Sequence, residues 1–416
     1  MLRPHLYEEF TAMTAKTILF LAYGGGHAHA LVPVVKLLQQ MQVKCVLLGI
    51  STGALTFRRA GLECLDFTDL VPEQFRKLVE TYGTELLAGN HNPSSGLTRE
   101  QSIAYLGLNY LDIVRREGEE KAGEFFSTQG RRCFLPLETM ESLIEDTKPD
   151  LVVTSISPRT ELAARIVANR RGIKSLAVAD TANPVLQDNS VLVDTLCIPN
   201  EISRASWMDM ACVKTKRIVV TGNPAYDHFS EVPKMERTSV LFCQQVCKFN
   251  TGKGKWENFE EKDFFEHFDR WSHVADALDV PCEVRLHPTA DKNIFSKWKA
   301  ARRRNLELDV EPYSAISLAS RKVVIGNFST ILTEALYLET PVVQYLYEGE
   351  IDTIDRFVEL GIVKSVGYDD VEGLVKITNQ AASGEIDFSN ELRRFRAQYP
   401  PPPAALKVVE QILSLV

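Results

Sequence analysis

Several short segments place glycine or polar residues where an apolar, strand-like run ends and a helix-like run begins. The first is Gly24, Gly25, Gly26 and His27, which follow TILFLA (17–22) after the single residue Tyr23. Glycines let a ligand approach the main chain, and a helix that begins there directs unpaired N–H groups at that ligand. His27 adds a side chain that exchanges protons near neutral pH. We predict a substrate-binding turn; the alternative is that the glycines only permit a tight turn and the histidine only caps the helix.

A second segment of this kind is KVVIGNFSTILTEALYLETPVVQY (322–345). The strand-like part stops at Asn327, and Ser329 and Thr330 open a helix whose free N–H groups and hydroxyls suit an anion. Glu334 follows one turn after Thr330 on the same face. We expect Glu334 to accept both hydroxyls of a ribose while phosphates rest on the helix N-terminus. The alternative is that Ser329 is an ordinary N-cap and Glu334 faces solvent.

Two further strand ends carry groups for proton transfer or phosphate binding. CEVRLHP (282–288) ends with Arg285 and His287, a cation and an imidazole that suit a phosphate oxygen. KSLAVAD (174–180) ends with Asp180, which competes with His27 as the candidate general base and could equally bond a loop amide. We favour His27 for this role.

The bulk composition excludes several classes of protein. The 416 residues include 45% hydrophobic and 25% charged residues and carry a net charge of −8, which argues against general nucleic-acid binding. The eight cysteines form no CxxC pair, so we interpret them as reduced, buried residues. No apolar stretch reaches the ~20 residues that span a membrane, and the N-terminal residues lack a signal-peptide pattern. We expect a cytoplasmic protein; the basic run KWKAARRR (297–304) is either a solvated helix face or a peripheral contact with the inner membrane face.

Short β-branched runs alternate with amphipathic ones along most of the chain, which predicts an α/β fold with parallel sheets. We predict an N-terminal domain at 1–228 with a helical insertion at 72–145. A C-terminal domain at 229–400 and a final helix at 401–416 follow. The polar stretch NTGKGKWENFEEKD (250–263) is expected to be a mobile loop.

The order of these motifs resembles a known superfamily. GGGHAHA, VVTGNPAYD (219–227), RLHP and NFSTILTEALYLETPVV follow one another as in the GT-B nucleotide-sugar glycosyltransferases and the related UDP-N-acetylglucosamine 2-epimerases. RLHP with the later Ser-Thr pair also resembles bacterial capsule and surface-polysaccharide transferases that use CMP- or CDP-activated donors. The resemblance implies two Rossmann-like domains that face a central cleft.

The resemblance also implies roles for the residues above. The donor nucleotide would lie in the C-terminal domain, with His287, Ser329 and Thr330 on its phosphates and Glu334 on its ribose. Arg285 and Asn327 would belong to the same donor site. The loop of Gly24, Gly25 and Gly26 would face the donor across the cleft, and Asn223, near the hinge, would also contact the donor. The chain has no DxD triplet, so we expect a metal-independent enzyme without a cofactor other than its donor substrate.

The expected activity is transfer of a sugar from a UDP- or CMP/CDP-linked donor to an acceptor, in surface glycan or glycolipid synthesis. The acceptor would be a glycan, a lipid-linked molecule or a small molecule, and the insertion at 72–145 favours such a second substrate. An inverting transferase needs one general base, whereas a retaining one needs none at that place. The alternatives are a 2-epimerase, which needs several acidic and His groups around the sugar, and a non-catalytic nucleotide-sugar-binding protein.

Overall fold

Each half of the chain builds a sheet of its own. The computed structural model describes residues 16–91, 95–182, 191–209, 213–250, 255–302, 305–311, 313–347, 352, 354–398 and 403–416. The contacts among these residues divide the chain into two compact units. The first unit holds the described residues up to Asp180, those from Val191 to Asp227 and those from Pro403 onwards, and the second holds His228 to Gln398.

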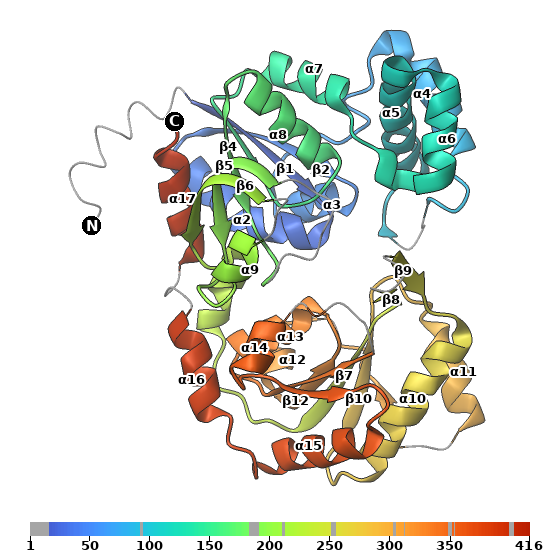
Figure 1. The fold of residues 1–416 in the computed structure, drawn as a ribbon, viewed down its shortest axis with the longest axis vertical. Helices are drawn as coiled ribbons and strands as arrows, with labels where there is room; N and C mark the ends of the chain where they lie inside the picture. The colour runs from blue at the N-terminus through green and yellow to red at the C-terminus, as the bar shows by residue number, and fades with distance from the viewer. Residues whose placement is uncertain are drawn as a thin grey trace, which may run out of the picture. The chain divides into compact units, whose positions relative to one another are not determined.

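The sheet of the first unit has six parallel strands in the order β2-β1-β3-β4-β5-β6. Its inner strands are mostly apolar because helices cover both faces (Figure 1). The strand order reverses between β1 and β3, and ligands of such sheets lie at the carboxyl ends of the strands beside that reversal. The strands are β1 (Thr17–Tyr23), β2 (Lys44–Ile50), β3 (Leu151–Thr154), β4 (Lys174–Val178), β5 (Val191–Ile198) and β6 (Val213–Val220).

The helices of the first unit form two buried layers, one on each face of the sheet. One layer includes α2 (Gly25–Gln40) and the final helix α17 (Ala404–Leu413), whose Val408 and Ile412 are buried with α2 in one core cluster. The last helix therefore returns to the first unit. The opposite layer includes α7 (Leu137–Thr147) and α8 (Thr160–Arg170). The other elements are α3 (Thr52–Arg59) and α9 (Arg204–Asp209), and the 3-10 segment η4 (Pro224–Glu231) begins in the first unit and ends in the second.

Residues 73–133 form a mostly helical segment of the first unit. A Cβ atom on Gly107 would lie 1.9 Å from the carbonyl oxygen of Val79, so only glycine allows α4 and α5 to pack this closely. Gly118, with φ of 89°, separates α5 from α6. The elements are η1 (Glu73–Phe75), α4 (Arg76–Glu85), α5 (Arg99–Glu117), α6 (Glu119–Gln129) and η3 (Gly130–Cys133).

The sheet of the second unit is also parallel and has the order β11-β10-β7-β12-β13-β14. This is the strand order of a dinucleotide-binding Rossmann sheet, with its reversal between β7 and β12. The strands are β7 (Ser239–Gln244), β10 (Cys282–Leu286), β11 (Glu307–Leu308), β12 (Arg321–Gly326), β13 (Val342–Leu346) and β14 (Lys364–Gly367). The helices are α10 (Glu261–Asp276), α11 (Asn293–Ala301), α12 (Ala315–Ala319), α13 (Thr330–Tyr337), α14 (Asp355–Glu359), α15 (Val371–Ser383) and α16 (Ser389–Gln398).

The prediction of a mobile loop at 250–263 is wrong, because most of the described residues there form a strand or the start of a helix. β8 (Cys247–Asn250) pairs with β9 (Lys255–Asn258) in an antiparallel hairpin, and α10 begins at Glu261. The ring of Phe259 lies 4.9 Å from that of His267, so tertiary packing anchors a segment that is polar in sequence. Residues 251–254 lie outside the described residues.

The basic run at 297–304 is largely ion-paired where the structure describes it. Lys297 lies 3.2 Å from Glu261, Lys299 lies 2.8 Å from Glu307, and Arg302 lies 2.6 Å from Asp269. These pairs agree with a solvated helix face. Arg303 and Arg304 lie outside the described residues, and none of the helices in the described ranges is long and apolar enough to cross a membrane.

Candidate functional site

Three turns at the carboxyl edge of the first sheet have an unusual backbone conformation. Gly24 (φ 83°) follows β1, Ser51 (φ 55°) follows β2, and Arg159 (φ 70°) follows β3, each directly before a helix. Positive φ is strained for a residue with a side chain, and such strain gathers at functional sites. Two of the three turns flank the reversal of strand order, so this edge is the candidate site of the first unit.

The three glycines differ in what the fold demands of them. The backbone at Gly24 has a φ of 83°, a conformation that favours glycine. A Cβ on Gly25 would lie 3.3 Å from the Thr56 hydroxyl, which is a tight contact. Gly26 is exposed, and a Cβ there would meet nothing closer than an Asp180 oxygen at 3.8 Å. The fold therefore does not explain Gly26, whereas close approach of a ligand to the start of α2 would explain it.

His27 and Asp180 meet at this edge. His27 Nδ1 lies 3.0 Å from Asp180 Oδ2, as an ion pair rather than an aligned hydrogen bond. Burial opposes the imidazolium charge, but the Asp180 carboxylate outweighs it and raises the pKa of His27 to about 9. The His27 side chain is 26% exposed and that of Asp180 is 12% exposed. Asp180 Oδ1 is buried and has no hydrogen-bond partner among the described residues, so it can accept a bond from a ligand hydroxyl.

Asn223 fixes the main chain beside this pair. Its Nδ2 donates to the carbonyl oxygen of Asp180 at 3.2 Å, and its Oδ1 accepts from the N–H of Ala225 at 3.0 Å. Both ends of the Asn223 amide are thus occupied within the first unit. Its contacts position Asp180, whereas the sequence predicts a donor contact for Asn223.

Glu161 and Arg165 form a buried ion pair next to this edge of the sheet. Glu161 is fully buried and accepts from the N–H of Tyr23 at 2.7 Å and from the hydroxyl of Ser155 at 2.9 and 2.7 Å. Arg165 Nη1 lies 3.9 Å from Glu161 Oε2 and donates to Thr154 and Ser155. Burial raises the pKa of Glu161 and lowers that of Arg165 to about 10. These bonds tie the ends of β1 and β3 to α8.

Arg159 brings a positive charge to the same edge. Its guanidinium carbon lies 4.4 Å over the ring of Tyr23, and its Nε is buried without a hydrogen-bond partner in the described part of the chain. Arg159 also acts on the pKa of His27, in the direction that lowers it. The sequence alone predicts no role for Arg159, Glu161 or Arg165. The detectable signal was a pair of opposite charges, four residues apart, in the otherwise apolar helix TELAARIVA.

The second unit presents the start of α13 at the carboxyl end of β12. Ser329 is the N-cap residue, but its side chain makes no capping hydrogen bond, and Thr330 is exposed. The first N–H groups of α13 and the two hydroxyls are therefore available for an anion. Asn327 is buried, and its carbonyl oxygen accepts from Gln344 Nε2 at 3.2 Å.

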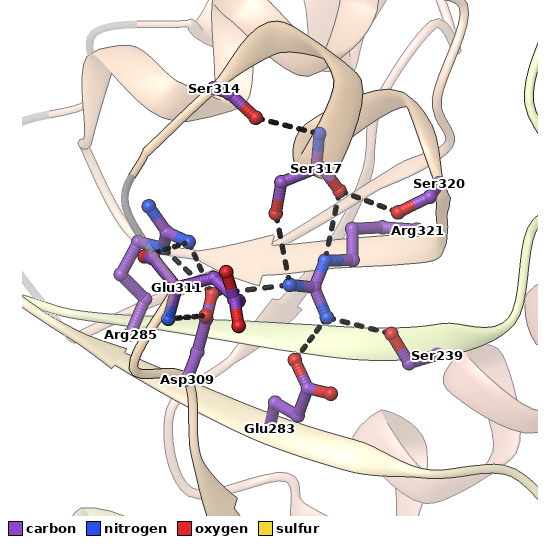
Figure 2. Close-up of polar contacts among 9 residues, drawn as sticks. All are labelled: Ser239, Glu283, Arg285, Asp309, Glu311, Ser314, Ser317, Ser320 and Arg321. Atoms are coloured by element: carbon purple, nitrogen blue, oxygen red, sulfur yellow. Dashed lines mark hydrogen bonds and ion pairs between the residues drawn. The ribbon is translucent and has the colours of Figure 1, made fainter.

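Glu334 and Arg285 already have partners. The hydroxyl of Tyr313 donates to Glu334, so a ribose would have to displace or share that contact. Burial raises the pKa of Glu334. Arg285 Nε and Nη2 both bond Asp309 Oδ2, at 2.8 and 2.5 Å. Figure 2 shows Arg285 and Arg321 converging on Asp309, and this network holds Arg285 against the face of the sheet.

Burial disfavours the charged form of two histidines of the second unit, His287 and His267. Burial lowers the pKa of His287, whose Nδ1 lies 2.8 Å from the hydroxyl of Thr289. Burial, with Arg270 and Lys248 nearby, lowers the pKa of His267 to about 3. His267 contacts Gln244 at the end of β7 and the hydroxyl of Tyr347. Within the described residues, no group of three or more His, Cys, Asp or Glu side chains is arranged to hold a metal ion.

The predicted residues thus form two groups. Gly24, Gly25, Gly26, His27 and Asp180 gather at the carboxyl edge of the first sheet. His287, Asn327, Ser329 and Thr330 follow β10 and β12, which flank β7 on either side. The ends of β10 and β12 therefore lie about 10 Å apart. Arg285, by contrast, is engaged in the ion-pair network.

Several solved structures have a fold similar to that of this chain. The UDP-GlcNAc 2-epimerase from Methanocaldococcus jannaschii, in complex with UDP-GlcNAc and UDP, is 14% identical, with a TM-score of 0.57 over 95% of this chain and 99% of that one. The UDP-GlcNAc 2-epimerase from Neisseria meningitidis, bound to UDP-GlcNAc, is 14% identical, with a TM-score of 0.57 over 96% and 100%. The glycotransferase of kitacinnamycin is 14% identical, with a TM-score of 0.59 over 96% and 99%.

This likeness concerns the fold, because the sequence identities are low. Neither a protein-family model nor a curated protein sequence matches the chain. The two parallel six-stranded sheets and the match over nearly the whole chain confirm the predicted α/β class. The chain has the GT-B fold, with two Rossmann-like domains.

Proposed function

We propose that this protein is a metal-independent glycosyltransferase that moves a sugar from a nucleotide-activated donor to an acceptor hydroxyl. The His27–Asp180 pair at the reversal of the first sheet is the observation that carries the proposal. It supplies one proton acceptor, and the open start of α13 supplies N–H groups for the donor phosphates. The donor is UDP- or CMP/CDP-linked, and the product belongs to surface glycan or glycolipid synthesis.

In this mechanism His27 accepts the proton of the acceptor hydroxyl while the bond between the sugar and the phosphate oxygen breaks. Asp180 stabilises the imidazolium that forms, since it lies 3.0 Å from Nδ1. The N–H groups of α13, the hydroxyls of Ser329 and Thr330 and the neutral His287 stabilise the charge that develops on the leaving phosphate. The transfer needs no metal ion under this proposal.

The raised pKa of His27 predicts how kcat/KM should depend on pH. Its pKa is about 9, so at neutral pH most of the histidine already carries a proton and cannot accept another. We expect kcat/KM to rise about tenfold per pH unit from pH 7 and to level off near pH 9. Asp180→Asn removes the main charge that raises the pKa of His27 while the burial that lowers it remains, so the rise shifts to lower pH and turnover falls. A flat profile between pH 7 and 9 would instead assign proton acceptance to Asp180.

A 2-epimerase is the second candidate, because the structure gathers His27, Asp180 and Glu161 at one edge. Epimerisation removes a proton from the sugar and returns it, which requires acid and base groups that touch the sugar. Glu161, however, is fully buried, and both its oxygens accept hydrogen bonds from the protein. Of these three described groups, only His27 and Asp180 are partly exposed, and this favours transfer.

One experiment separates these activities and a non-catalytic binder. The protein is first screened for thermal stabilisation by UDP, GDP, CDP, CMP and dTDP, since a ligand of the native state raises apparent stability. It is then incubated in D₂O with the matching nucleotide sugars, with and without acceptor candidates, and followed by NMR. Acceptor-dependent release of the nucleotide without deuterium on the sugar ring supports transfer. Deuterium at carbon 2 of the sugar indicates epimerisation, and nucleotide binding without either reaction indicates a binding protein.

A further inference from the structure

A groove in the second unit lies away from the site described above. Three of its lining residues, Arg237, Ala319 and Glu339, come shortly before β7, β12 and β13. The groove therefore lies toward the amino ends of the strands, whereas Ser329 and His287 follow their carboxyl ends. Its volume is about 940 Å³, which is enough for a small-molecule ligand. We call it the basic groove.

Apart from Ala319, the lining residues of the basic groove come from three chain segments. They are residues 229–237, the end of α13 with Glu339, and residues 387–396, which include most of α16. α13 and α16 lie next to each other in the second unit (Figure 1). Phe229 and Leu392 are buried in these walls and supply apolar surface.

Positive charge dominates the polar part of the groove. Four cationic side chains line it, Lys234, Arg237, Arg393 and Arg396, against two carboxylates, Glu339 and Asp387. This excess of two positive charges stands in a chain whose net charge is −8. The excess is therefore local rather than a reflection of composition.

The two carboxylates are occupied, whereas two of the guanidinium groups bond neutral oxygens. Glu339 lies 3.6 Å from Arg396, and Asp387 accepts from the N–H of Ser389 at the start of α16 at 2.8 Å. Arg237 Nη2 donates to the carbonyl oxygen of Glu339 at 2.5 Å. Arg393 donates to Asn390 Oδ1 at 2.6 Å. Arg237 and Arg393 thus keep their charge and further N–H groups for an anion, and a planar guanidinium matches phosphate oxygens in pairs.

We propose that the basic groove binds a phosphorylated small molecule, whose phosphate contacts Arg237 and Arg393 and whose apolar part packs on Phe229 and Leu392. This site is separate from the proposed donor site. The chain enters the second unit through 229–237 and leaves it after α16, so the ligand contacts both the incoming and the outgoing segment. This placement suits an effector rather than a substrate.

The test measures binding of phenyl phosphate, which carries one phosphate and one apolar ring, to the full chain by isothermal titration calorimetry. Arg393→Gln is the main variant, because Arg393 is exposed and its loss should not disturb folding. Arg394→Gln is the matched control: Arg394 is exposed on the same helix and does not line the groove. We expect saturable binding that weakens at least tenfold in Arg393→Gln and in Arg237→Gln, and that changes less than twofold in Arg394→Gln.

Two further arms exclude other sites and other sources of phosphate. Ser329→Ala, which removes a proposed phosphate contact of the donor site, should leave phenyl phosphate binding unchanged. Vesicles that contain phosphatidic acid should not bind the protein more tightly than neutral vesicles do. Equal loss in Arg393→Gln and Arg394→Gln, loss in Ser329→Ala, binding to anionic vesicles alone, or no binding of phenyl phosphate would each overturn the proposal.

Discussion

The carboxyl edges of the two sheets have similar topology but differ in the protonation of their histidines. At the first edge, Asp180 raises the pKa of His27 to about 9, so an ion pair exists at neutral pH. At the second edge, burial lowers the pKa values of His287 and His267, so both rings are neutral. The first edge can therefore move protons, whereas the second offers uncharged donors to an anion.

The backbone differs in the same way. Three turns at the first edge have positive φ, two of them at residues with a side chain. At the second edge, Ser329 has the ordinary extended conformation of an N-cap residue, with φ of −70°. Strain persists only where the surrounding structure enforces it. The buried Glu161 and Arg165 supply that structure at the first edge, because they tie β1, β3 and α8 together.

The largest effect is expected from removing the proton acceptor of the first edge. His27→Gln should lower kcat by about 10² to 10⁴ because a positioned base contributes this much, while nucleotide binding stays unchanged. His287→Gln, in the second unit, is the matched variant and should raise KM for the donor more than it lowers kcat. Steady-state kinetics with both variants checks this division of roles. Transfer at the parent rate by His27→Gln would contradict it.

A large loss of stability is expected when the buried ion pair of Glu161 and Arg165 is broken. Arg165→Ala leaves Glu161 charged and buried without its partner, which costs about 3–5 kcal/mol of unfolding free energy. Arg170→Ala, on the exposed side of the same helix, should cost less than about 0.5 kcal/mol. Denaturant unfolding of the two variants measures the difference. Equal stabilities would show that the pair does not hold the first edge together.

A smaller effect is expected at the second edge. Glu334→Ala should weaken nucleotide binding about tenfold, the loss of one charged hydrogen bond, and leave kcat at saturating donor nearly unchanged. Tyr313→Phe removes the hydroxyl that occupies Glu334 and should leave nucleotide binding equal or tighter. Calorimetric titration with the nucleotide found in the stability screen tests both variants. Unaltered affinity in Glu334→Ala would remove Glu334 from the donor site.

The smallest change is a single methyl group on the glycine turn. Gly26→Ala should keep or raise stability by about 0.4–1 kcal/mol, because Gly26 is helical and its Cβ would have space. Its kcat/KM should nevertheless fall, since the methyl group occupies the approach to the start of α2. Gly123→Ala is the matched control, with a Cβ also 3.8 Å from its nearest neighbour, and should leave activity unchanged. Thermal unfolding and kinetics of both variants decide whether Gly26 serves a ligand.

Most strands were predictable because buried parallel strands are short apolar runs. The runs that begin at Thr17, Lys174 and Cys282 coincide with β1, β4 and β10. β14 (Lys364–Gly367) was missed because it is a half-exposed edge strand with little apolar character. The hairpin of β8 and β9 was missed because its packing partner His267 lies in a different element.

By itself, the sequence determined the parallel sheets and the positions where strands give way to helices, since both depend on local apolar patterns and turn residues. Only the tertiary structure decided which polar residues are free to act. Asp180 approaches His27 across more than 150 intervening residues, Asp309 occupies Arg285, and Tyr313 occupies Glu334. The physical reason is that charge and hydrogen-bond capacity depend on the neighbours that the fold supplies, and no local pattern in the chain encodes those neighbours.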